Sequence, residues 1–154
     1  MALGLGANLG NRLKSLRTAV THIKNREGIL LVNASDVYES APWGVREQPC
    51  FLNACITIAT QLSPHKLLDV LKEIERIMGR QVRDRWEARE IDLDILLFKE
   101  GTVIQEEKLM IPHPFLAERA FVLCPLAQIV PEWRHPLLHK SIRELQERMD
   151  CSDM

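Results

Sequence analysis

The chain has 154 residues, of which 46% are hydrophobic and 27% charged, and its formal net charge is −1. These values are typical of one globular domain, spanning 1–154, that buries a core without disulfide or metal staples. The near-neutral charge argues against a general attraction to nucleic acid or to an anionic membrane. We also expect neither a signal peptide nor a membrane span, because no basic leader or long apolar run is present.

The cysteines indicate a reducing compartment. Cys50, Cys55, Cys124 and Cys151 form no CxxC pair and have no zinc-finger spacing. Cys55 and Cys124 lie in apolar contexts, which favours buried thiols over metal ligands. We therefore predict a cytoplasmic protein whose cysteines stay reduced.

The hydrophobic pattern predicts core elements in the order strand, helix, strand, strand, helix, strand. This order is the ferredoxin-like βαββαβ pattern, an α+β fold in which helices cover one face of an antiparallel sheet. The other face is then free for a ligand or for added elements. The predicted elements are a strand at 1–6, a helix from Leu13 to Ile23 ended by Gly28, strands at 29–38 and 51–60, a helix that starts at Ser63-Pro64 and runs to about Met78, and a strand at 90–98.

Further elements are predicted after this core. Val103-Ile104 is a candidate short strand, and 114–129 reads as helical segments broken by Pro125. Ser141 and Glu144 form a capping box that opens a last helix. We therefore expect an extra C-terminal strand and helices to complete the fold.

The strand at 90–98 carries two carboxylates on one face. Asp92 and Asp94 are two residues apart and therefore point to the same face of the strand. The strand is expected to be buried on both faces toward its C-terminal end, so these carboxylates lie where it emerges from the core. Adjacent carboxylates repel each other, so ionising both needs a compensating cation. Mg²⁺, which binds one or two carboxylates together with substrate phosphates, meets this need. The alternation places Ile91, Leu93, Ile95 and Leu97 on one face and Glu90, Asp92, Asp94, Leu96 and Phe98 on the other.

A local excess of basic side chains precedes this strand. Arg80, Arg83, Arg85 and Arg89 span a segment that is too short for a nucleic-acid surface and well sized for a polyphosphate. The alternative is a solvated aspartate pair beside ordinary surface arginines. The turn at 6–11 is rich in glycine but lacks both GxxxxGK[ST] and a full GxGxxG, so a tight turn is a better interpretation than a nucleotide-binding loop.

Aromatic and polar residues later in the chain could bind a flat ligand. Phe51 is followed by Asn53, and Phe121 is preceded by Arg119, so two rings and an amide would suit a heteroaromatic molecule by stacking and edge hydrogen bonds. The alternative is that both rings belong to the core. His113 lies in a stiff Pro-His-Pro loop that holds its imidazole in place, although a packed or surface histidine would look the same.

Taken together, these motifs resemble the 6-hydroxymethyl-7,8-dihydropterin pyrophosphokinase family of folate synthesis. The resemblance runs from the first strand to about Pro131, with the motifs in order and near the family spacing. The combination of R-W-x-x-R-x-x-D-L-D with P-H-P and R-x-F is its most specific part. The matching segments are 6–10, 38–44, 48–54, 75–80, 85–89, 91–95, 112–114 and 119–123.

The resemblance implies transfer of pyrophosphate from ATP to the hydroxymethyl group of the dihydropterin, with release of AMP. The substrate oxygen would attack the β-phosphorus, and alignment and charge neutralisation would supply most of the catalysis. Two Mg²⁺ ions are implied, with Asp92 and Asp94 as their ligands and ATP as co-substrate. Arg80 and Arg89 would be catalytic together with these aspartates, in a loop that gates turnover.

The resemblance also implies which residues contact each substrate. Trp86 would help the basic loop to close, and Glu75 would lie near the nucleotide, although it could equally be a solvated helix glutamate. The expected ATP contacts are Glu75, Arg80, Trp86, Arg89, Ile95, Lys108, His113 and Arg119. The expected pterin contacts are Asn8, Ser40, Ala41, Trp43, Phe51, Asn53, Asp92 and Phe121.

The sequence departs from the family pattern at three places. The basic loop is about one residue shorter, so Arg83 has no assigned counterpart. Phe51 replaces a tyrosine of some relatives, which keeps stacking and loses a hydroxyl. Pro114 replaces an aromatic residue of some relatives.

Two other functions remain open from the sequence. One is a ferredoxin-like binding module without Mg²⁺ dependence, although no basic stripe with exposed aromatics supports nucleic-acid binding. The other is a Mg²⁺-dependent ATP enzyme that acts on a different flat alcohol. We expect a monomer that acts on small molecules, with no nucleic-acid or membrane partner.

Overall fold

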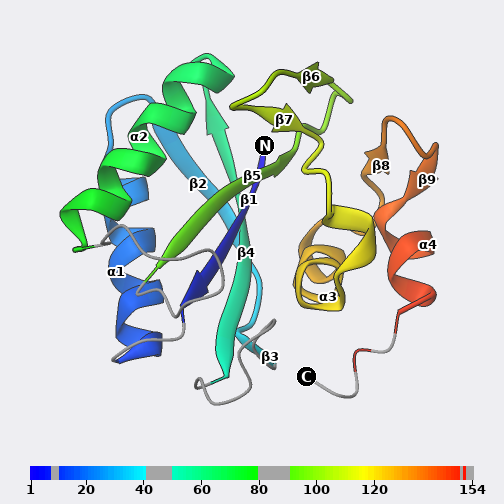
Figure 1. Ribbon diagram of the computed structural model, residues 1–154, viewed down its shortest axis with the longest axis horizontal. Coiled ribbons are helices and arrows are strands. Elements are labelled where there is room, and N and C mark those ends of the chain that lie inside the picture. Colours follow the sequence, from blue (N-terminus) through cyan, green and yellow to red (C-terminus); the bar gives the residue numbers. More distant parts are fainter. Residues whose placement is uncertain (8–10, 41–49, 80–90, 150, 152–154) are drawn as a thin grey trace.

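The computed structural model describes residues 1–7, 11–40, 50–79, 91–149 and 151 (Figure 1). Its first part contains the predicted core, and its second part adds short strands and helices. The core elements are β1 (Ala2–Ala7), α1 (Arg12–Lys24), β2 (Ile29–Ala34), β3 (Tyr38–Ser40), β4 (Phe51–Thr60), α2 (Pro64–Ile77) and β5 (Asp92–Leu97). The later elements are β6 (Ile104–Gln105), β7 (Met110–Ile111), the 3-10 helix η1 (Leu116–Glu118), α3 (Ala120–Ile129), β8 (Arg134–His135), β9 (Lys140–Ser141) and α4 (Ile142–Glu147).

The main sheet is antiparallel, and its order is β2-β4-β1-β5, with β3 paired to the same side of β4 as β2. Helices α1 and α2 cover one face, whereas α3 and α4 lie on the other side of the sheet (Figure 1). The α+β, ferredoxin-like prediction is confirmed. None of the helices in the described ranges is long and apolar enough to cross a membrane.

Apolar side chains form a core on each side of the sheet. Burying a leucine or isoleucine stabilises a fold by about 1.5–3 kcal/mol relative to leaving it exposed, so both layers contribute to holding the sheet. The core under α1 and α2 includes Leu16, Ile23, Leu67, Leu71 and Ile74, and the core under α3 and α4 includes Leu116, Leu123, Leu126, Ile142 and Leu145.

Local sequence signals explain where most helices begin. The Asn11 side chain accepts a hydrogen bond from the Lys14 amide, and Ser63 caps α2 with Pro64 in the first turn. Ser141 and Glu144 form both halves of the predicted capping box. The first helix ends at Lys24 rather than at Gly28, which has a φ of +84° in the turn before β2.

The prediction of one continuous strand at 29–38 is wrong, because this segment contains two strands, β2 and the start of β3. The pairing of β2 with β4 shifts register between Leu31 and Asn33. Ser35 then leaves the regular ladder: its amide donates to the Cys55 carbonyl at 2.8 Å, and its hydroxyl accepts from the Cys55 amide at 2.9 Å. This side chain replaces a strand partner, so β3 starts anew at Tyr38.

Helix α3 docks on the sheet through polar as well as apolar contacts. Gln128 accepts hydrogen bonds from the Asp36 amide and the Tyr38 hydroxyl, both at 2.9 Å, and donates to the Asp36 carboxylate at 2.9 Å. The predicted break at Pro125 is wrong, because α3 continues through this proline. Pro125 is buried, and burial of its apolar ring opposes the cost of the backbone hydrogen bond that a proline cannot donate.

The alternation predicted for β5 holds up to Ile95 and then fails. Leu3 pairs with Ile95 and Ala2 pairs with Leu97, so Leu96 is the extra residue of a β-bulge. As a result Leu97 packs in the core on the α3 side and Phe98 packs in the core under α1 and α2, the reverse of the prediction.

The cysteine prediction also needs a correction. Cys124 is buried as expected, but it forms a disulfide with Cys151 rather than a free thiol. Cys50 and Cys55 are free, and Cys55 is fully enclosed between the sheet and α3. Burial raises the pKa of the Cys55 thiol well above its ordinary value, because a thiolate there would lose its solvation.

This arrangement predicts the pattern of thiol alkylation. In native, unreduced protein we expect mass spectrometry to find Cys50 labelled first and Cys55 labelled only slowly, with Cys124 and Cys151 unlabelled. Reduction under denaturing conditions is the control and should expose all four. Rapid labelling of Cys124 in the unreduced protein would contradict the disulfide.

Candidate functional site

The two aspartates and Asn53 lie in neighbouring rows on one face of the sheet. Asp92 pairs with Gly6 of β1, and Gly6 pairs with Asn53 of β4. Asp94 pairs with Gly4 in the next row along the same strand. Because paired residues of antiparallel strands project to the same face, the carboxylates and the Asn53 amide face the same side, the side on which α3 lies.

The β1 residues opposite the two aspartates are glycines, so no β1 side chain projects from this face there. A Cβ atom on Gly6 would lie 3.3 Å from Asn53 Oδ1 and 3.8 Å from the Phe51 ring. A Cβ atom on Gly4 would meet the Leu96 side chain at 3.3 Å. Gly4 therefore makes room for core packing, whereas Gly6 leaves a flat floor beside Phe51 and Asn53. A planar ligand could approach the sheet closely there.

Asn53 is buried and held in one orientation. Its side chain is only 6% exposed, and its Nδ2 atom donates to the hydroxyl of the buried Ser40 at 2.7 Å. The Oδ1 atom therefore faces Gly6, where it can accept a hydrogen bond from the edge of a ligand. Phe51 is half-buried two residues earlier on the same face of β4.

The aspartates suit a hard cation. Asp92 is half-buried at the start of β5, and Asp94 is exposed on the same face. Two carboxylates provide oxygen ligands for Mg²⁺, whose remaining positions are commonly filled by water and phosphate. Within the described ranges no group of three or more His, Cys, Asp or Glu side chains has a metal-binding arrangement. Mg²⁺ commonly takes one or two carboxylates from a protein, so this pair is a candidate site for the ion.

Glu75 lies on α2, behind β5. It is only 5% exposed, and its Oε2 atom accepts a hydrogen bond from the Leu93 amide at 2.9 Å. Among the described residues β5 is at the edge of the sheet, and on that side the Leu93 amide bonds this side chain rather than another strand. The buried Glu75 carboxylate thus binds the edge of β5 at Leu93, between Asp92 and Asp94. Contact of Glu75 with ATP stays a prediction.

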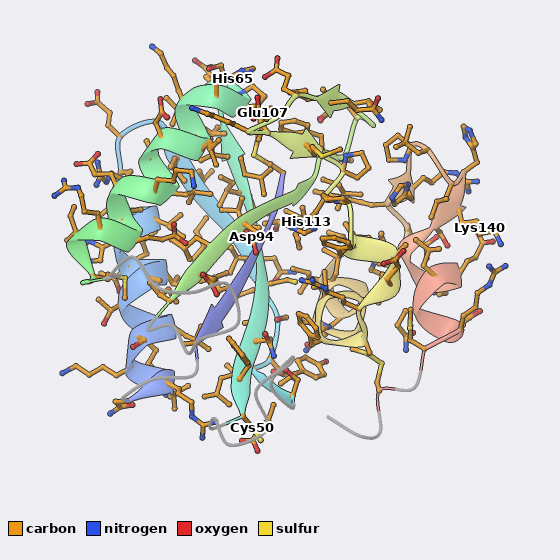
Figure 2. All side chains as sticks on the ribbon, viewed as in Figure 1. Cys50, His65, Asp94, Glu107, His113 and Lys140 are labelled. Carbon is orange, nitrogen blue, oxygen red and sulfur yellow. A yellow bond between two sulfur atoms is a disulfide. The ribbon has the colours of Figure 1, made fainter. Side chains whose placement is uncertain are left out.

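His113 is positioned by the backbone beside Asp94 (Figure 2). Its amide donates to the Leu96 carbonyl at 2.8 Å, and its Nδ1 atom accepts from the Phe115 amide at 3.2 Å. With Nδ1 as acceptor, the neutral ring carries its proton on Nε2. Burial lowers the pKa of His113, Asp94 opposes this effect and Arg119 adds to it, so the neutral form is favoured. The residue can therefore donate a hydrogen bond from Nε2.

The first turn of α3 brings Arg119 and Phe121 to the same region. The Arg119 carbonyl accepts from the Val122 and Leu123 amides at 3.0 Å, which starts the helix. The Arg119 guanidinium carbon lies 5.5 Å from the centre of the Phe121 ring. Phe121 is half-buried on the helix that packs against β4. The chain thus presents rings from both layers, Phe51 on the sheet and Phe121 on α3.

Two predicted contacts lie elsewhere. The Ile95 side chain is buried in the core on the opposite face of β5. Lys108 is exposed between β6 and β7, a hairpin whose Glu106 is bonded to His65 at the start of α2 at 2.6 Å. Their contacts with ATP stay predictions. Six further predicted residues, Asn8, Ala41, Trp43, Arg80, Trp86 and Arg89, lie outside the described residues.

Sequence reasoning missed two features of the site. The hydrogen bond from Leu93 to Glu75 has no local sequence signal, because the partners belong to different elements. Phe115 lies next to His113, and the guanidinium of Arg119 stacks over its ring. The position of Phe115, two residues after His113 and four before Arg119, could have indicated these contacts. The sequence alone did not distinguish it from an ordinary surface residue.

The fold is that of a ferredoxin-like α+β domain, and comparison with known proteins specifies the family. Residues 2–131 match the model for 7,8-dihydro-6-hydroxymethylpterin-pyrophosphokinase (HPPK). The chain therefore belongs to this family, and it is a pyrophosphokinase by that membership.

Curated relatives agree with this family. The chain is 43% identical over 150 residues to a 2-amino-4-hydroxy-6-hydroxymethyldihydropteridine pyrophosphokinase of Methylorubrum extorquens, covering 97% of this chain and 93% of the relative. It is 40% identical over 144 residues to the protein of the same name from Aquifex aeolicus, covering 94% and 88% respectively.

A solved structure agrees in fold. Wild-type HPPK-DHPS of Plasmodium falciparum with pteroate superposes with a TM-score of 0.76 at 18% identity, over 96% of this chain. The match spans only 41% of that longer chain. At this level of identity the similarity concerns the fold alone.

The buried Glu75 predicts a specific loss of stability. Glu75→Ala should lower the free energy of unfolding by about 2–3 kcal/mol, because the Leu93 amide stays buried without its acceptor. Glu75→Gln keeps an acceptor oxygen and should cost about 1 kcal/mol or less. Urea denaturation measures both, with Glu73→Ala on the same helix as an exposed control. Equal losses for Glu75→Ala and Glu73→Ala would show that this hydrogen bond is unimportant.

Proposed function

We propose that this protein transfers pyrophosphate from ATP to the 6-hydroxymethyl group of 6-hydroxymethyl-7,8-dihydropterin, giving AMP and the dihydropterin diphosphate. The observation that carries the proposal is the row Asp92, Gly6 and Asn53 across three adjacent strands. The backbone of Asp92 lies about two strand spacings, roughly 10 Å, from that of the buried Asn53, and Asp94 follows in the next row on the same face. A phosphate-bearing substrate and a planar alcohol can therefore meet on this face.

The pterin side of the site is proposed from chemical fit. Phe51 and Phe121 come from opposite layers and would stack on the two faces of a flat ring. Asn53 Oδ1 would accept a hydrogen bond from the ring edge, since its Nδ2 is already engaged by Ser40. Because this amide is buried and already oriented, it favours a ligand with a hydrogen-bond donor at the matching position. A ligand without that donor would bury the Asn53 Oδ1 atom without a hydrogen bond from the ligand.

The phosphate side is proposed from charge. Arg119 would neutralise the charge of triphosphate oxygens. His113, whose neutral form is favoured, would donate a hydrogen bond from Nε2 to a phosphate oxygen. Asp92 and Asp94 would hold Mg²⁺, which when bound would neutralise phosphate charge and polarise the transferred group. None of the described site residues needs to act as a nucleophile, because the substrate oxygen attacks the phosphorus directly.

From the sequence and its family we also propose that two Mg²⁺ ions bind and that Arg80 and Arg89 are catalytic. Trp86 and Lys108 would contact ATP, and the protein would be a single-domain monomer located in the cytoplasm.

The proposal is tested by the identity of the nucleotide product. With ATP, Mg²⁺ and 6-hydroxymethyl-7,8-dihydropterin we expect AMP to form in step with a pterin diphosphate, and EDTA to stop the reaction. ADP instead of AMP would indicate ordinary phosphoryl transfer. No nucleotide product from folded protein would contradict the proposed reaction.

The division of the site predicts separable effects of two substitutions. Asp94→Ala should lower turnover on the order of 100-fold or more, with pterin affinity kept, because only the phosphate side loses a ligand. Phe51→Ala should weaken pterin binding about tenfold and leave the KM for ATP near its wild-type value. Steady-state kinetics and pterin fluorescence titration measure these effects, and each variant is the control for the other. Equal loss of both affinities in Phe51→Ala would make Phe51 a core residue.

A further inference from the structure

Phe115 is an apolar side chain exposed beside the proposed phosphate site. It is 40% exposed, although its neighbour Leu116 is fully buried. Its ring centre lies 6.0 Å from that of His113, tilted by 54°.

The Arg119 guanidinium lies over this ring. Its central carbon is 4.7 Å from the centre of Phe115 and 5.5 Å from the centre of Phe121. Both distances are within the range of about 6 Å in which a cation is attracted to the face of an aromatic ring. One cation is thus in contact with two rings, of which Phe115 is the nearer.

Hydrogen bonds hold the backbone that carries the Phe115 ring. The Phe115 amide donates to His113 Nδ1, and the Leu116 amide donates to the His113 carbonyl at 3.1 Å. Leu116 and Leu123 anchor the segment on either side of Arg119 in the core under α3. The backbone that carries the ring is therefore held relative to both His113 and the start of α3.

We propose that Phe115 is a positioning residue that holds the Arg119 guanidinium ready for the phosphates of ATP; this inference rests on the proposed function of Arg119. A free arginine side chain loses considerable rotamer freedom when it binds a ligand. Stacking on Phe115 restricts the guanidinium before ATP arrives, so less of that cost is met on binding. Because the ring acts only through Arg119, its effect should concern ATP and not the pterin.

The test compares ring-keeping and ring-removing substitutions. Phe115→Leu keeps an apolar side chain but removes the aromatic face, whereas Phe115→Tyr keeps the face. Leu137→Ala, at an exposed position in the segment between β8 and β9, is the matched control. Each variant is assayed for kcat and both KM values, and its affinity for a non-hydrolysable ATP analogue is measured by calorimetry.

We expect Phe115→Leu to raise the KM for ATP and the analogue dissociation constant about three- to tenfold, with the pterin KM unchanged. Phe115→Tyr should restore both values to within about twofold of wild type. In an Arg119→Met background, Phe115→Leu should cause less than about a twofold further change, because the cation it positions is gone.

Three results would overturn the inference. They are a Phe115→Tyr variant no better than Phe115→Leu, an unchanged ATP affinity in Phe115→Leu, and an undiminished effect of Phe115→Leu in the Arg119→Met background. Absence of AMP formation by the wild type would overturn the proposed reaction instead. Calorimetry with the ATP analogue would still decide the role of Phe115 in that case.

Discussion

The register of β1 against β4 and β5 is the constraint on which the candidate site depends. Strand β1 pairs with both neighbours, so Gly6 fixes the positions of Asp92 and Asn53 at the same time. A slip by one residue in either pairing would turn a carboxylate or the amide into the opposite core. The apolar alternation of all three strands opposes such a slip, because it would also expose core residues. The packing of the fold therefore guarantees the geometry of the site.

The second face of the sheet explains why the site has two walls. A ferredoxin-like sheet with helices on one side would leave Asp92, Asp94 and Asn53 open to solvent. Helix α3 covers part of that face, and Gln128 binds it to the segment between β2 and β3. The covering stops short of Asp94, which stays exposed. The partly covered face thus carries polar side chains on β5 and an aromatic side chain on the first turn of α3.

Local patterns in the sequence were sufficient for most of the fold and for the shared face of Asp92 and Asp94. The period-two alternation placed Asp92 and Asp94 together, and the caps at Ser63 and Ser141 located two helices. The errors share one physical cause, which is that tertiary contacts decided the outcome. The β5 bulge, the continuous α3 and the bond between Cys124 and Cys151 depend on partners that are distant in sequence, and disulfide connectivity cannot be deduced from spacing.

The β5 bulge also links the two halves of the phosphate side. Leu96, its extra residue, accepts a hydrogen bond from the His113 amide, and Asp94 precedes Leu96 by two residues on the same strand. The relation between the Asp94 carboxylate and the His113 imidazole is therefore set by a backbone contact rather than by the packing of flexible side chains. The same segment continues through Phe115 to Arg119, so among the described residues His113 and Arg119 both follow from this contact with β5. In a regular strand the Leu96 carbonyl would have a different orientation and would not accept from the His113 amide in the same way. Strand β5, which carries the aspartates, would then no longer position His113 and Arg119.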